Sequence, residues 1–100
     1  MKKLLIVLAL SVAVSAPAFA NDVIEQCKSV ERLAGSIMSA RQNNVSIVKS
    51  LEIAGDNEAM KSIVMDAYEQ GAMSYEPNKV RQRADFANKW VMICIKVNSR

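Results

Sequence analysis

The most regular alternation of apolar and polar positions lies in residues 77–97. Two adjacent apolar rows run through this segment at helical spacing, namely Val80, Ala84, Ala87, Val91 and Cys94, and beside them Phe86, Trp90, Ile93 and Val97. The remaining positions are mostly polar: Lys79, Gln82, Asp85, Lys89 and Lys96. A stripe two rows wide is typical of a helix that packs against more than one neighbour. We therefore expect a helix with Pro77 at its first position, placed at the centre of a small bundle.

A first helix is expected to begin at Asp22, because Glu25 follows three residues later as in a capping box. Apolar side chains then recur at steps of three and four: Val23, Cys27, Val30, Ala34, Ile37 and Met38, with Ile24 and Leu33 widening the stripe. The polar run 41–44 is expected to end this helix.

Two shorter helices are expected between these long ones. Residues 45–54 give the weaker pattern, with Val45, Val48 and Leu51 on one side. Gly55 and Asn57 are expected to close that helix and to cap the next. The third helix starts at Glu58 and carries Met60, Ile63, Val64, Ala67 and Tyr68, and Gly71 is expected just past its end. The pattern predicts an all-α up-down bundle of four helices, with a three-helix variant as the alternative.

The first twenty residues have the pattern of a bacterial secretory signal peptide. Lys2 and Lys3 precede an apolar run, residues 4–14, which is too short to cross a bilayer. Ala20 completes a small-residue cleavage motif, so the mature chain is expected to begin at Asn21. We expect residues 1–20 to be removed, residues 21–100 to form one domain, and no stable membrane anchor to remain after cleavage.

Without the leader, the chain has eleven basic and ten acidic residues, a formal charge of +1. This balance gives no reason to expect a nucleic-acid partner. The domain is small enough to need a covalent link. Cys27 and Cys94 are its only cysteines. In an exported chain such a pair predicts one disulfide, and the antiparallel topology brings both residues to the same end of the bundle.

Composition excludes several kinds of chemistry. The chain has no His, which removes His-dependent triads, His-ligated zinc and His-ligated haem. A Cu(I) site is conceivable from the five methionines of the mature chain: Met38, Met60, Met65, Met73 and Met92. Core packing is favoured instead, because Met38 and Met60 fall within core rows and no M-x-x-M repeat appears. We expect neither a cofactor nor a metal.

Carboxylates give only a minor alternative. Asp66 with Glu69, or Glu69 with Glu76, is the kind of acidic pair that glycoside hydrolysis uses. A helical domain of this size rarely offers a deep cleft, so we expect no enzyme.

Parts of the sequence resemble a known group of proteins. The segments 33–42 (LAGSIMSARQ) and 67–69 (AYE), followed by Pro77, Phe86 and Cys94, resemble small exported proteins of unknown function from proteobacteria, their prophages and tailed phages. The resemblance covers most of the mature chain. It implies export and a helical fold, and it carries no catalytic residues.

We therefore expect a periplasmic or secreted, non-enzymatic protein that binds another protein. The resemblance to phage-associated proteins would suit an inhibitor, immunity or lysis-related role. The candidate partner-binding residues are Arg41, Met65 and Tyr75, because Arg41 ends a helix and the other two fall outside the core rows. The last turn of a helix also favours a cation such as Arg41 without any partner. Self-association and a periplasmic stress chaperone are the alternatives.

Overall fold

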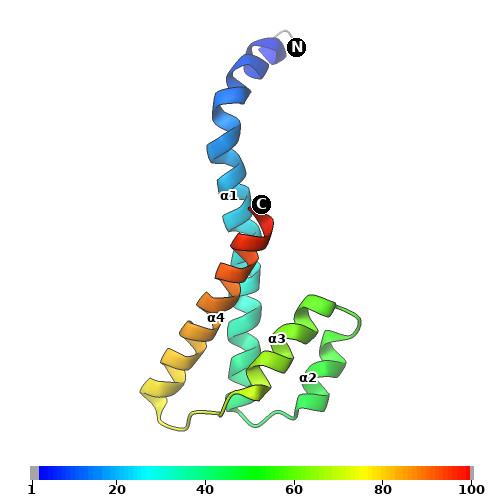
Figure 1. Ribbon diagram of the computed structural model, residues 1–100, viewed down its shortest axis with the longest axis vertical. Helices are drawn as coiled ribbons and strands as arrows, with labels where there is room; N and C mark the ends of the chain where they lie inside the picture. Colours follow the sequence, from blue (N-terminus) through cyan, green and yellow to red (C-terminus); the bar gives the residue numbers. More distant parts are fainter. Residues whose placement is uncertain (1–2, 100) are drawn as a thin grey trace.

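The computed structural model describes the backbone of residues 3–99 and the side chains of residues 22–99. Four α-helices make up the described fold: α1 (Lys3–Gln42), α2 (Ile47–Ala54), α3 (Glu58–Glu69) and α4 (Glu76–Asn98). They alternate in direction along the chain, and α2 and α3 form a short hairpin beside the C-terminal half of α1 (Figure 1). The predicted all-α four-helix fold is confirmed.

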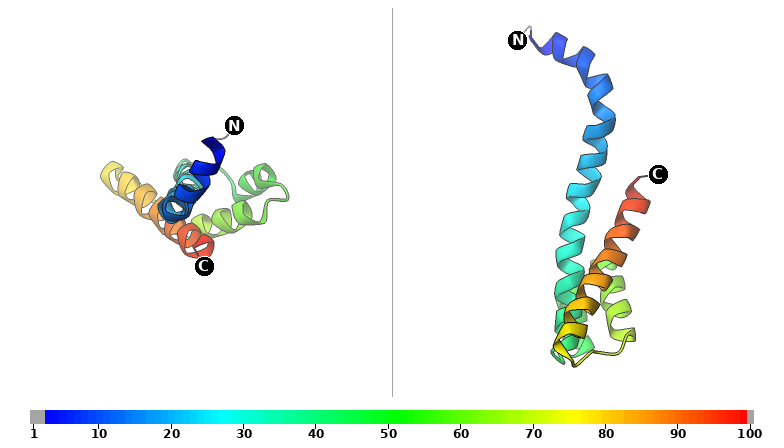
Figure 2. Two further views of the ribbon diagram at one scale, coloured as in Figure 1. Left: turned by 90° about the horizontal axis from the view of Figure 1, so that it is seen from above. Right: turned by 90° about the vertical axis from the view of Figure 1, so that its left-hand side faces the viewer.

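The first helix, not the last, is the centre of the fold. α1 contacts α2, α3 and α4, whereas α4 packs mainly on α1 (Figure 2). The expectation that residues 77–97 form the central helix was wrong. The reason is length: α3 has 12 residues against 23 in α4, so it covers only part of the α1–α4 pair.

The expected start of the first helix was also wrong. Asp22 and Glu25 lie inside α1, which runs continuously from Lys3, so no capping box forms between them. Glu25 instead pairs with Lys28 on the exposed surface, with 2.9 Å between Oε2 and Nζ. The expected cleavage site at Ala20 and Asn21 lies outside the residues whose side chains are described.

The turns between the helices follow local rules. Asn44 has a positive φ of 65° and the amide of Val45 bonds to the carbonyl of Ala40, which closes α1 as a Schellman motif. Gly55, with φ 59°, ends α2, and the side chain of Asn57 accepts a bond from the amide of Met60 to cap α3. The roles of Gly55 and Asn57 were both predicted.

Two expectations about helix ends were not met. α3 ends on Gln70, whose backbone is extended, and Gly71 does not have the positive φ of a C′ glycine. Pro77 is the second residue of α4, because the helix starts at Glu76 after Tyr75 as the N-cap.

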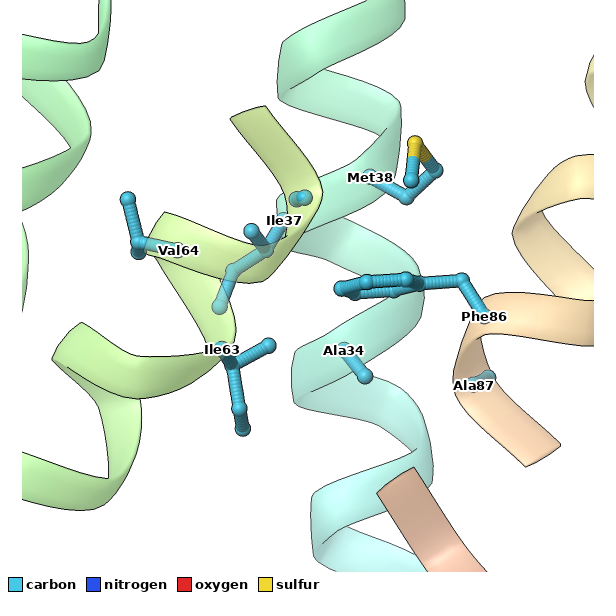
Figure 3. Close-up of a cluster of buried hydrophobic side chains, with 8 residues drawn as sticks. Ala34, Ile37, Met38, Ile63, Val64, Phe86 and Ala87 are labelled. Atoms are coloured by element: carbon cyan, nitrogen blue, oxygen red, sulfur yellow. The ribbon is translucent and has the colours of Figure 1, made fainter. Parts of the chain in front are cut away.

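The main core lies where α1, α3 and α4 meet (Figure 3). Its buried side chains are Ala34, Ile37 and Met38 of α1, Ile63, Val64 and Ala67 of α3, and Phe86 and Ala87 of α4. Met38 and Val64 are completely buried. Ala34 and Ala87 let α4 approach α1 closely, and the ring of Phe86 points between α1 and α3 (Figure 3).

The two predicted rows of α4 are buried only in part. Five of these side chains face the other helices to differing extents: Phe86, Ala87, Trp90, Val91 and Cys94. By contrast Val80, Ala84, Ile93 and Val97 are exposed. Ile93 and Val97 continue the row of Phe86 and Trp90 beyond the reach of α3. On α2, Val48 is exposed too, although it was expected on the buried side.

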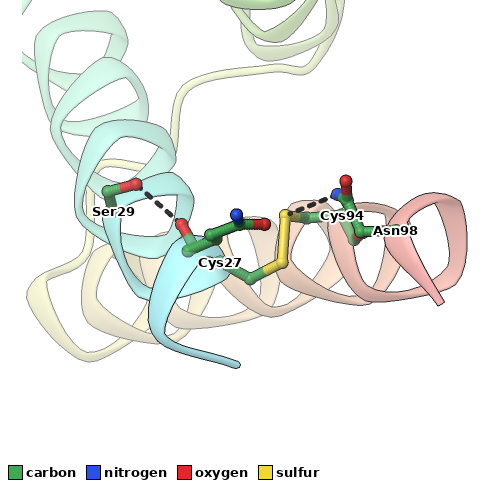
Figure 4. The surroundings of a disulfide bond; sticks show 5 residues. Cys27, Ser29, Cys94 and Asn98 are labelled. Carbon is green, nitrogen blue, oxygen red and sulfur yellow. Dashed lines mark hydrogen bonds between the residues drawn. A yellow bond between two sulfur atoms is a disulfide. The ribbon is translucent and has the colours of Figure 1, made fainter. Parts of the chain in front are cut away.

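A disulfide joins α1 to α4 at the end away from the hairpin (Figure 4). Cys27 and Cys94 have Cα atoms 5.8 Å apart and are separated by 67 residues in sequence. Cys27 is fully buried. Nδ2 of Asn98 donates to the carbonyl of Cys94, over 2.8 Å, in the same turn of α4. The predicted bridge and the antiparallel arrangement that motivated it are confirmed.

Candidate functional site

Polar side chains join the helices at the end where α1 stops and α4 begins. Nε2 of Gln42 donates to the carbonyl of Lys79 and to Oε1 of Gln82, each over 2.9 Å. Nη1 of Arg83 donates to Oε1 of Gln42, also over 2.9 Å. Gln42 is buried, and these three bonds satisfy both of its polar atoms. We call Gln42, Lys79, Gln82 and Arg83 the polar clamp.

The polar clamp also holds the segment 70–75 that links α3 to α4. Nε2 of Gln82 donates to the carbonyl of Gly71, over 2.8 Å, while its Oε1 accepts from the amide of Met73. Nε of Arg41 donates to the carbonyl of Gln70, over 3.1 Å. An extended linker is thereby fixed by side chains of both long helices.

The linker presents two large side chains to the outside. Tyr75 is 66% exposed and Met73 is 45% exposed. Beside Met73 a hollow of about 350 Å³ opens between the linker and α4, with Met73, Arg81, Asp85 and Lys89 among its lining residues. We call Met73, Tyr75 and the rim of this hollow the loop face. Tyr, Met and Arg are the residue types enriched at protein–protein contacts.

The three candidate partner-binding residues lie apart. Arg41 stands in the last turn of α1, half-buried, with its guanidinium 5.3 Å from the ring centroid of Tyr68. Its hydrogen bond to Gln70 and this stacking tie the end of α1 to α3 and the linker, contacts that the helix-dipole interpretation of Arg41 did not include. Met65 is 45% exposed on α3. Of the three, only Tyr75 belongs to the loop face, as one of its two linker side chains, and none of the three lines the hollow itself.

The candidate carboxylates are engaged in different contacts. Asp66 is half-buried and accepts a hydrogen bond from Nε1 of Trp90, over 2.9 Å, and it also pairs with Lys89. Glu76 pairs with Lys79 at 3.1 Å, while Glu69 is exposed on the last turn of α3. Asp66 therefore ties α3 to α4.

The methionines divide between core and surface. Met38 is buried and Met60 packs against the core, as their spacing predicted. Met65, Met73 and Met92 are exposed, and Met65 and Met92 were expected outside or at the edge of the core rows. Among the described side chains, no group of three or more Cys, Asp or Glu residues is arranged to hold a metal ion. Within the described part of the chain, no helix is long and apolar enough to span a bilayer.

Sequence reasoning missed the polar clamp. Lys79 and Gln82 were placed on the solvated side of α4, yet both are only half-exposed. A signal was present, because Gln42 falls four residues after Met38 and eight after Ala34, at a core position of α1. A polar residue at such a position requires partners, and these come from α4.

Comparison with known proteins finds no family model, no curated protein and no solved structure that matches the chain. The resemblance to exported phage-associated proteins accordingly stays a prediction. It is notable that its segments 33–42 and 67–69 meet in space: Arg41 stacks on Tyr68, and Ala34, Met38 and Ala67 share the core. These residues therefore have structural roles in this chain.

Proposed function

We propose that the protein is a non-enzymatic binding protein that acts by stoichiometric association with another protein through the loop face. The observation that carries this proposal is the position of Tyr75. Its ring is 66% exposed, on a linker whose backbone is fixed by Arg41 and Gln82. An aromatic side chain has only two rotatable bonds, so on a backbone held near Gln70 and Gly71 it loses little conformational freedom on binding, which favours a role as an anchor.

The surroundings of Tyr75 support the same role. Met73 adds an adaptable apolar side chain, and Arg81 supplies an exposed cation at the rim of the hollow. No hydrogen bond or ion pair within the described residues engages the Arg81 side chain. Apolar anchors inside a polar rim are the usual anatomy of a contact surface.

The proposed location is the periplasm or the extracellular medium. The disulfide between Cys27 and Cys94 supports an oxidising compartment. The leader-like pattern of residues 1–20 supports export, and the phage-like resemblance supports an inhibitor, immunity or lysis-related partner. Intact mass of the exported protein tests the location: the mature chain is expected to begin at Asn21, and a soluble protein that retains residues 1–20 would contradict export with cleavage.

A stress chaperone is the second candidate, and the exposed row on α4 favours it. Met92, Ile93 and Val97 remain uncovered near the disulfide, as an apolar surface of a chaperone would. Chemical crosslinking in the native compartment, followed by mass spectrometry, separates the two functions. The proposed function predicts one recurrent partner, whereas a chaperone predicts many partners that increase at low pH.

The decisive variant is Tyr75→Ala, compared with Val48→Ala. Both residues are exposed by more than half, but Val48 lies on α2, away from the loop face. Tyr75→Ala is expected to lose the recurrent crosslink, and Val48→Ala to keep it. If only self-crosslinks are found, the exposed apolar side chains would belong to a homodimer interface instead. A recurrent partner that both variants retain would place the contact elsewhere on the molecule.

A further inference from the structure

A small apolar pocket lies where α1, α2 and α3 meet. Its volume is about 160 Å³, and it is separate from the loop face. Six apolar side chains form most of its lining: Leu33, Ile37 and Ala40 of α1, Ile53 of α2, and Met60 and Val64 of α3. Ile37 and Val64 are buried, whereas Ile53 is 64% exposed. The pocket thus has a buried floor and an accessible rim.

The pocket exists because small residues face one another across the junction. Ser36 and Ala40 of α1 and Ser50 of α2 occupy positions where larger apolar side chains would fill the space. The pocket is a partly open hollow, so the apolar side chains on its walls lack the packing contacts that a filled interior would give them. An apolar occupant would restore those contacts.

Polar bonds hold α2 in place over the pocket. Tyr68 of α3 donates from its hydroxyl to the carbonyl of Val45, over 2.7 Å, just before α2 begins. The turn through Gly55 and the Asn57 cap fixes the other end of α2 to α3. With both ends tied, α2 does not collapse into the gap, so the pocket is largely preformed.

The floor of the pocket offers few hydrogen-bond partners to water. The Oγ of Ser50 already pairs with the hydroxyl of Tyr68, over 3.0 Å, and no buried side-chain nitrogen or oxygen of the described residues lacks a partner. A buried water needs two to four polar partners, which this floor does not supply. Because the pocket is open on one side, an apolar ligand could enter and displace water that has few polar partners at the floor.

We propose that this pocket is a binding site for a small, uncharged apolar molecule about the size of one aromatic ring. The volume suits a single ring or a short branched hydrocarbon. A charged ligand is disfavoured, because no charged side chain lines the pocket to compensate its lost hydration. Ile53 stands at the entrance, where its side chain would close over the ligand.

Titration of the methyl-labelled full domain with benzene, monitored by NMR, tests the site. Saturable shifts are expected at the methyl groups of Ile37, Ile53 and Val64. Absence of saturable binding, or shifts centred on other methyl groups, would overturn the proposal.

Variants locate the binding. Ala40→Leu fills the pocket and is expected to weaken benzene binding at least about tenfold, while thermal unfolding shows the domain still folded. Ile53→Asp is expected to do the same by placing a carboxylate at the entrance. Val48→Asp is its matched control, since Val48 is equally exposed on α2 but does not line the pocket. If Ala40→Leu does not fold, the two α2 variants decide: equal affinities in both would refute the assignment.

Discussion

Gln42 of α1 and Gln82 of α4 share a hydrogen bond of 2.9 Å between Nε2 and Oε1, although 40 residues separate them in sequence. Through this pair the end of α1, the start of α4 and the linker 70–75 become one unit. The disulfide joins the same two helices at the opposite end. α4 is therefore fastened to α1 at both ends, by polar bonds at one and by a covalent bond at the other.

Loss of the Gln42 side chain is expected to destabilise the fold. Gln42→Ala removes two donated bonds and leaves Arg83 without its acceptor, so the free energy of unfolding should fall by about 1–3 kcal/mol. Urea denaturation measures this. Gln26→Ala is the control, because Gln26 is exposed on the same helix. Equal stability of the two variants would mean that the polar clamp does not contribute to the fold.

The disulfide should contribute a comparable amount to the free energy of unfolding. Replacing Cys27 or Cys94 with Ser is expected to lower the free energy of unfolding by about 2–4 kcal/mol, because the bridge closes a long loop in the unfolded chain. Before any reductant is added, alkylation under denaturing conditions should label neither thiol. Labelling of both in the freshly isolated protein would show that the bridge does not form in the cell.

Two glycines should respond oppositely to substitution by alanine. Gly35 lies inside α1 with open space where a Cβ would stand, so Gly35→Ala should raise stability by about 0.5–1 kcal/mol. Gly55 has a φ of 59°, which strains a residue with a Cβ, and Gly55→Ala should lower stability by about 1 kcal/mol or more. Thermal unfolding of both variants compares them. If Gly35→Ala were destabilised instead, another segment would have to pack against α1 at Gly35 too closely to leave room for a methyl group.

Met38 and Met65 form a matched pair that tests the core. Met38 is completely buried between α1 and its neighbours, and Met38→Ala should cost about 2–5 kcal/mol. Met65 is 45% exposed, and Met65→Ala should change stability by less than about 0.5 kcal/mol. Chemical denaturation of the monomeric protein measures both. A large cost at Met65 in such a measurement would mean that its side chain packs within the fold.

The number of helices was predictable because it follows from short-range rules, and the disulfide because it follows from the helix directions and the number of cysteines. Apolar spacing and the turn residues Gly55 and Asn57 mark the elements in the sequence itself. With alternating directions, the first and last helices run antiparallel, and only Cys27 and Cys94 are available to pair. These features do not depend on how long each helix is relative to the others.

The burial of α4 was not predictable, because it depends on the reach of another helix. The periodicity of Phe86, Trp90, Ile93 and Val97 is uniform, yet only the first two lie opposite α3. The same limit applies to the candidate site. Tyr75 was singled out because it falls in a linker, but the bonds from Arg41 and Gln82 that support the linker come from distant segments.

The central position of α1 has a consequence for the order of events during synthesis. Its apolar stripe is matched by α3 and α4, and the partner of Cys27 is 67 residues further along the chain. A chain made from its N-terminus must therefore carry α1 with that stripe uncovered until the later helices have followed. During that interval the nascent chain is most exposed to aggregation and to proteases.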